Sequence, residues 1–309
     1  MPSGARQIKT RLKSIRNTKK VTKAMELVAG AKMRRAVERA LQSRQYTTLV
    51  WQLAQRLSHS KAVDESDALH RFFSKPEHPK RFLLIAFSSN RGLCGAYHSN
   101  ILRKTIAFVR EKGEKNVELV VIGKRLVSAV SLYGIKPSMA FVKEESATDM
   151  ASIAQIAAHA YTKFRDGFID EAYICYSQFK SALSQEAVVR PLFPFSLKHS
   201  VTADVEHIKM HQPLPAVSTF TIEQTYLYEP GKKEVLTALV PRLGEAELYQ
   251  ALVESNASEH SARMIAMKNA TEAAGDMLND LLLQYNRARQ AGITQEIAEI
   301  SAGSAALTS

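Results

Sequence analysis

Helical periodicity occupies both ends of the chain. Residues 6–57 contain no proline and one glycine, Gly30, and small or apolar residues recur there in steps of three and four. They are Ile8, Leu12, Ile15, Thr18, Thr22, Met25 and Ala29. This spacing places one thin stripe along a helix of about 50 residues, roughly 75 Å long at 1.5 Å per residue. The other faces are basic, so we expect the stripe to need a partner.

The C-terminal end supplies a matching pattern. Residues 245–302 contain no proline, and a 3,4,3,4 spacing runs through Met264, Met267, Thr271, Ala274, Leu278, Leu281, Tyr285, Ala288 and Gly292. This spacing predicts a coiled-coil seam on a helix roughly 85 Å long. Because the two helices lie at opposite ends of the chain, they most simply pair antiparallel across an inserted domain. The alternative is that each helix packs separately on that domain.

The middle of the chain alternates strands and helices. After a connector over residues 58–80, apolar runs predict strands at 81–89, 117–123, 139–142 and 171–179, with helices at 99–112, 124–133 and 147–164. This alternation is typical of a parallel or mostly parallel α/β sheet. Residues 188–244 contain six prolines and predict a return segment with an edge strand around 218–228.

The predicted fold is therefore a mixed α+β and α/β one, with a long antiparallel helical coiled coil and an inserted Rossmann-like α/β domain. We divide the chain into an N-terminal long helix (1–58), a connector (59–80) and an α/β domain (81–220). The return segment and the C-terminal long helix follow (221–309).

Composition and charge refine this picture. The chain has 309 residues, 45% of them hydrophobic and 23% charged, which is a globular composition. No apolar run approaches the ~18–20 residues that span a bilayer. The formal charge of +12 is unevenly distributed: residues 1–44 carry +11, residues 245–309 carry −5, and the middle carries +6. Helices of opposite charge at the two ends are natural partners.

The basic N-terminal helix suggests three kinds of partner. It could bind nucleic acid through phosphate contacts, face an acidic protein surface, or be a solvated face. The first aromatic residue is Tyr46, so this helix offers no stacking platform, and no helix-turn-helix or zinc-finger signature is present. Physical reasoning favours a protein surface and leaves the other two open. The helical pattern begins near Arg6 without an apolar signal region, so we expect no presequence.

Two glycine-containing turns are candidates for phosphate binding. Residues 91–96 (RGLCGA) follow the first predicted strand, where backbone N–H groups could cradle a phosphate, but the dinucleotide-binding spacing is incomplete. A tight turn that needs glycine is the favoured interpretation. Residues 121–125 (VIGKR) contain Gly-Lys without the Walker spacing, so we expect no nucleotide hydrolysis by this chain.

Cysteine and histidine give no clear catalytic or metal site. Cys94 is a weak nucleophile candidate, because no His/Asp pair accompanies it, and Cys175 reads as an inert buried thiol. His207 and His211 are four residues apart but lie outside any zinc motif, so a solvated segment is favoured over metal ligation. We expect no catalytic residue, cofactor or metal.

Several longer motifs resemble one family. Residues 8–18 (IKTRLKSIRNT) and 22–34 (TKAMELVAGAKMR) resemble the start of the gamma subunit of F-type ATP synthases. Residues 261–271 (SARMIAMKNAT) and 285–296 (YNRARQAGITQE) resemble its C-terminal helix, and residues 91–95 its turn after the first strand. These motifs are specific, and they occur in order over nearly the whole chain.

The resemblance implies a central rotor stalk that is not itself catalytic. Its coiled coil would stand inside the alpha3beta3 head, and its α/β domain would lie beside the epsilon subunit and on the c-ring. Rotation would couple proton flow to ATP synthesis or hydrolysis at the beta-subunit sites. The chain would bind no nucleic acid and would be peripheral, through the complex, to the cytoplasmic side of a bacterial inner membrane.

The resemblance also implies partner contacts for particular residues. Six residues of the long helices would contact the beta subunit: Arg289, Gln290, Arg263, Met25, Lys20 and Lys23. Tyr228 and Glu229 would contact the c-ring. The paired-cysteine insertion of chloroplast relatives has no counterpart here, so we expect no thiol switch.

Overall fold

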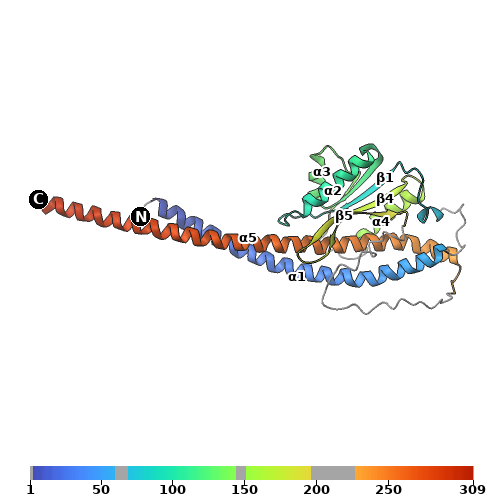
Figure 1. Ribbon diagram of the computed structural model, residues 1–309, viewed down its shortest axis with the longest axis horizontal. Coiled ribbons are helices and arrows are strands. Elements are labelled where there is room, and N and C mark those ends of the chain that lie inside the picture. Colours follow the sequence, from blue (N-terminus) through green and yellow to red (C-terminus); the bar gives the residue numbers. More distant parts are fainter. Residues whose placement is uncertain (1–2, 60–68, 144–150, 196–226, 309) are drawn as a thin grey trace. The chain divides into compact units, whose positions relative to one another are not determined.

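The computed structural model describes residues 3–59, 69–143, 151–195 and 227–308. The chain divides into two compact units (Figure 1): Met1–Gly30 with Arg263–Ser309, and Ala31–Ala262. Helices α1 (Ser3–His59) and α5 (Lys232–Thr308) each pass through both units. We call the first the helical unit and the second the α/β unit.

A five-stranded sheet forms the centre of the α/β unit. Its order is β3-β2-β1-β4-β5; the first four strands are parallel, and β5 runs antiparallel to β4. The strands are β1 (Phe82–Phe87), β2 (Val117–Ile122), β3 (Met139–Phe141), β4 (Glu171–Phe179) and β5 (Gln185–Phe193).

Helices cover both faces of this sheet. Helices α2 (Tyr97–Lys112) and α3 (Lys124–Ser131) pack on one face, with side chains such as Leu84 of β1 between them and the sheet. Helix α4 (Ala151–Arg165), the start of α5 and the end of α1 pack on the other, where Ile85 points. All six residues of β1 are therefore buried, which accounts for its unbroken apolar sequence FLLIAF.

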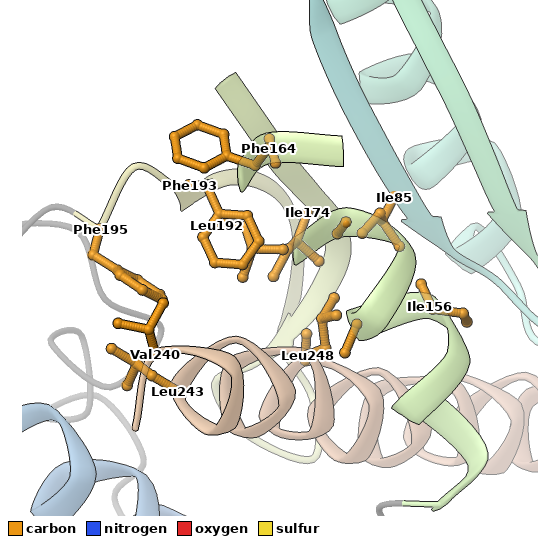
Figure 2. Close-up of a cluster of buried hydrophobic side chains, with 14 of the residues drawn as sticks. Ile85, Ile156, Phe164, Ile174, Leu192, Phe193, Phe195, Val240, Leu243 and Leu248 are labelled. Atoms are coloured by element: carbon orange, nitrogen blue, oxygen red, sulfur yellow. The ribbon is translucent and has the colours of Figure 1, made fainter. Parts of the chain in front are cut away.

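Aromatic residues join the start of α5 to the sheet. Figure 2 shows Phe195 close to Val240 and Leu243 of α5, with Phe193 and then Phe164 further from that helix in the same buried cluster. The ring centroids of Phe193 and Phe195 lie 5.1 Å apart in an edge-to-face arrangement, and those of Phe193 and Phe164 lie 5.4 Å apart. Two short helices, η1 (His70–Phe72) and η2 (Glu114–Asn116), complete the unit.

The structure confirms most of the predicted elements and corrects two. Strand β5 lies partly within the segment that we expected to be a return, although Pro191 interrupts its sequence. β5 is at the edge of the sheet, where a missing N–H does not break a second ladder. The expected edge strand around 218–228 lies almost wholly outside the described residues.

The second correction concerns the start of α5. We expected the long C-terminal helix to begin near residue 245, but it begins at Lys232 and contains Pro241. A proline inside a helix costs about 3 kcal/mol. Leu236, Val240 and Leu243 around it are fully buried in the core, and this burial holds the helix together across the proline.

The helical unit consists of two paired helices. Thr271 Oγ1 lies 2.8 Å from Thr22 Oγ1, and Lys19 reaches over Gly275, one helical turn further along α5. Residue numbers therefore rise on one helix as they fall on the other, and the pairing within this unit is antiparallel, as the sequence predicts. Met267 and Ala274 of the predicted seam are buried.

Candidate functional site

The six candidate contacts with a beta subunit all belong to the helical unit. Lys20, Lys23 and Met25 lie on α1, and their side chains are exposed. On α5, Arg289 and Gln290 are exposed, because they fall between the seam positions 288 and 292. A sixth residue, Arg263, is half-buried. None of the six is buried, and this corrects the prediction for Met25, which belongs to the predicted apolar stripe of the N-terminal helix but is 40% exposed.

Large apolar side chains lie among these polar residues. On α1 the exposed fractions are 52% for Val21, 40% for Met25, 62% for Leu27 and 56% for Val28. On α5 Met277, Leu283 and Ile293 are also exposed. Exposed apolar groups mixed with cations are typical of a surface that binds another protein. One cation is partly offset, since Lys23 Nζ lies 3.0 Å from Glu26 Oε1.

The candidate c-ring contacts lie in the α/β unit. Tyr228 and Glu229 lie shortly before α5, which begins at Lys232. Tyr228 is half-buried against the core, and Lys232 Nζ lies 5.9 Å from its ring centroid. Glu229 is exposed. The structure therefore assigns these two residues and the six above to different units rather than to one site.

The glycine turn after β1 is held by a side chain that bonds to neighbouring segments. Leu93 and Gly95 have φ angles of 62° and 56°, and Gly95 accepts this conformation without strain. Asn90 Oδ1 accepts a hydrogen bond from the backbone N–H of Lys124 at 3.0 Å, and Asn90 Nδ2 donates one to the backbone carbonyl of Lys143. Cys94 is buried. These contacts favour a structural turn over a phosphate site.

The described residues contain no arrangement suited to metal or thiol chemistry. No three His, Cys, Asp or Glu residues among them are grouped as metal ligands. Burial raises the pKa of Cys175 to about 12, so it stays a thiol. His207 and His211 lie outside the described residues. None of the helices in the described part of the chain has the length and apolar character needed to cross a bilayer.

Sequence reasoning missed a polar layer between α1 and α5 in the α/β unit. Three side chains of α5 at three- and four-residue spacing each contact a side chain of α1: Gln250 with Ser43 (2.5 Å), Glu254 with Arg44 (3.4 Å), and Glu247 with Trp51. Burial raises the pKa of Glu254 even beside Arg44. The helical spacing of Glu247, Gln250 and Glu254 could have indicated this layer. A search restricted to small and apolar residues at such a spacing does not find these polar ones.

Comparisons with known proteins place the chain. A family model described as ATP synthase matches residues 4–307. The ATP synthase gamma chain of Chloroflexus aurantiacus is 37% identical over 311 residues, with all of both chains covered. That of Glaesserella parasuis is 35% identical over 311 residues, covering 99% of this chain and 100% of its own. The chain belongs to the ATP synthase gamma-chain family.

Solved structures share its fold. A chain from the Tetrahymena thermophila mitochondrial ATP synthase, central stalk and c-ring, has a TM-score of 0.59 at 22% identity and covers 81% of this chain and 99% of its own. A chain from the Euglena gracilis mitochondrial ATP synthase, OSCP, F1 and c-ring, has a TM-score of 0.66 at 16% identity. It covers 99% of this chain and 95% of its own. As a gamma chain, the protein is the central stalk subunit of an F-type ATP synthase and is not a catalytic subunit.

Proposed function

We propose that this gamma chain is the rotor that couples proton-driven rotation of a c-ring to ATP synthesis and hydrolysis at beta-subunit sites. The observation that carries the proposal is the helical unit. Its two helices share one thin seam, and their outer faces expose both cations and large apolar side chains. Such a pair suits enclosure by other subunits, here an alpha3beta3 head on the cytoplasmic side of a bacterial inner membrane.

Contacts with the beta subunit would come from two groups of side chains. Lys20 and Lys23, three residues apart on α1, would face acidic side chains of beta, and Met25, about 200° around the helix from Lys23, would contact beta separately. Each exposed ion pair contributes only about 0–1 kcal/mol, so these lysines would act together. Arg289 and Gln290 would donate hydrogen bonds to a beta loop, and Arg263 would lie near the level of the lysines. Of Arg289 and Gln290, Arg289 should contribute more to the contact, because its planar guanidinium can donate two hydrogen bonds to one carboxylate.

The α/β unit would serve as the foot of the rotor. Its parallel strands with helices on both faces suit a Rossmann-like domain inserted between the long helices, with boundaries near residues 81 and 220. Tyr228 and Glu229, shortly before α5, would contact the c-ring, and the epsilon subunit would lie beside the sheet.

Reconstitution with alpha and beta subunits tests the rotor function. We expect the wild-type chain to rotate inside alpha3beta3 during ATP hydrolysis, as seen with a bead fixed to the α/β unit. Equal ATPase activity with and without the chain, and no rotation, would refute the proposal.

The variants Arg289→Ala and Arg287→Ala test the beta contact. Both arginines are exposed on α5, but two residues of helix separate them by about 200°, so they point to nearly opposite sides. We expect Arg289→Ala to lower ATPase activity of the assembly by about fivefold or more, as for a contact worth over ~1 kcal/mol. The control Arg287→Ala should change it less than about twofold. Equal losses in the two variants would contradict the assignment.

Glu229→Gln tests the c-ring contact. In membrane vesicles that hold the whole complex, we expect this variant to lower ATP-driven proton pumping more than ATPase activity. Glu114→Gln is the matched control, because it removes the same charge from an exposed position on η2. Unchanged pumping in Glu229→Gln would exclude a role for this carboxylate.

A further inference from the structure

One short stretch of α5 is attached to the sheet and its helices by polar side chains. Residues 251–259 of α5 are buried on every side, and four polar residues in or just after this stretch reach other elements. We call them the α5 anchor: Ser255, Ser258, Glu259 and Ser261. All four are at most 6% exposed.

Two anchor residues reach helix α2 and strand β4. The hydroxyl oxygens of Ser255 and Tyr97, the first residue of α2, lie 2.6 Å apart. Ser258 Oγ donates to the backbone carbonyl of Ser177 in β4 at 2.9 Å. The second contact is to backbone, so it fixes α5 against the strand itself rather than against a mobile side chain.

The other two anchor residues reach the segments that follow β3 and β4. Glu259 Oε2 lies 2.8 Å from Nζ of Lys143, which follows β3, and both side chains are less than a tenth exposed. Ser261 Oγ donates to the carbonyl of Ala182 in the β4–β5 turn and accepts from Gln185 Nε2 at 3.1 Å. The four anchor residues therefore make five contacts, spread over α2, β4, the end of β3, the β4–β5 turn and the start of β5.

Directional contacts resist motions that apolar packing permits. Hydrophobic attraction itself is non-directional, and close packing of side chains resists a large displacement of α5 more than a small turn. A hydrogen bond weakens steeply with distance and angle, so a small turn of α5 about its axis would break several anchor contacts together. The α/β unit ends at Ala262, immediately after the anchor. A twist applied to the later part of α5 thus enters this unit at the anchor.

On the basis of the rotor function proposed above, we propose that the α5 anchor carries torque between α5 and the α/β domain. Ser258 and Ser261 are its positioning residues, because each bonds a backbone carbonyl of the sheet layer. They act through helix α5 and take no direct part in the chemistry of ATP.

Hydrogen exchange in the full chain tests the attachment itself. The double variant Ser258→Ala, Ser261→Ala removes two hydroxyls and leaves the packing nearly unchanged. We expect amide exchange in residues 255–262 to rise by about fivefold for each bond lost. The matched control is Thr47→Val, which removes a buried hydroxyl whose bond, to Ser43 O at 3.0 Å, stays within α1. It should leave exchange in residues 255–262 unchanged. Equal exchange in the double variant and wild type would overturn the proposal.

Torsional measurements on the reconstituted alpha3beta3 complex test the torque. We expect the double variant to keep wild-type ATPase activity and unloaded speed, because the helices still fold. Its torsional stiffness should fall by about half, since three of the five anchor contacts are lost, and its rotation should slow selectively under viscous load. A merely structural role would not produce this load dependence. If the wild-type chain rotates and the double variant has the same torsional stiffness, the proposal for the α5 anchor is refuted but the rotor function is not. A wild-type chain that did not rotate would overturn the rotor function.

Discussion

Two glycines of α5 should respond in opposite directions to replacement by alanine. In a helix, alanine is favoured over glycine by about 1 kcal/mol. A Cβ atom on Gly244 would lie 2.9 Å from Cζ of Phe193 and 3.3 Å from its Cε1. A Cβ atom on Gly275 would lie 3.0 Å from Nζ of Lys19. The gain in helix propensity is the same at both sites, so the neighbour decides the outcome.

The two neighbours differ in their freedom to move. Phe193 is 1% exposed, and its ring packs against Phe72 at 5.3 Å and Phe195 at 5.1 Å. Overpacking such a site costs about 1–3 kcal/mol, so Gly244→Ala should destabilise the chain by up to about 2 kcal/mol. Lys19 is exposed, and its flexible end can swing away. Gly275→Ala should therefore stabilise the helical unit by up to about 1 kcal/mol.

Urea unfolding of the full chain, followed by circular dichroism at 222 nm, measures both effects. Amide exchange then locates each change in its own unit, around residue 244 or residue 275. The reasoning about Phe193 would be refuted by a Gly244→Ala chain as stable as wild type. A destabilised Gly275→Ala chain would show that the helices need glycine for close approach there.

Three further predictions concern charged and thiol groups. Arg44→Met should lower the free energy of unfolding, measured in urea, by about 3–5 kcal/mol, because the carboxylate of Glu254 stays buried without the cation that it contacts. Adding Glu254→Met should recover most of this loss. Burial would raise the pKa of Asp170, but hydrogen bonds from Arg81 and from neighbouring backbone N–H groups outweigh it and lower the pKa to about 2. A depressed pKa stabilises the fold above the unfolded value of ~3.9, so about 2 kcal/mol should be lost as the pH falls from about 4 to about 2; Asp170→Asn should lack this loss in acid titrations of stability. Both cysteines are buried, so a thiol reagent should label neither in the folded chain and both in urea, and labelling of the folded chain would contradict the structure.

Apolar periodicity predicted the elements whose burial is mainly apolar. The unbroken run of β1 follows from burial on both faces, and the seam of α5 follows from contact with a single helix. In the predicted seam, Met267 and Ala274 are buried, whereas residues between seam positions, such as Met277 and Leu283, are exposed. The period therefore located the seam on α5, whereas on α1 two residues of the predicted stripe, Thr18 and Met25, are exposed.

Prolines misled the reasoning where tertiary structure outweighs local preference. Pro191 is tolerated in β5 because that strand has one neighbour, and Pro241 is tolerated in α5 because buried leucines and valine surround it. Neither compensation is visible in the local sequence. The partner-contact residues, such as Arg289 and Glu229, came only from family resemblance, because an exposed side chain carries no pattern that identifies its partner.

The structure refines the meaning of the charge pattern. The sequence suggested that the acidic C-terminal helix offsets part of the basic N-terminal one, and Glu254 does pair with Arg44 of α1. However, Glu247, Glu254 and Glu259 are all buried within the α/β unit, where Glu247 contacts Trp51 and Glu259 contacts Lys143. The helical unit holds twelve basic and six acidic residues, so it retains a formal charge of +6. Its cations are therefore not neutralised by its own partner helix. Under the proposed rotor function, this excess is what acidic surfaces of the surrounding subunits would meet, and at the ionic strength of a cell it would act only over about 8 Å. Charge can then favour particular angular positions of the rotor only where an acidic surface comes close to it.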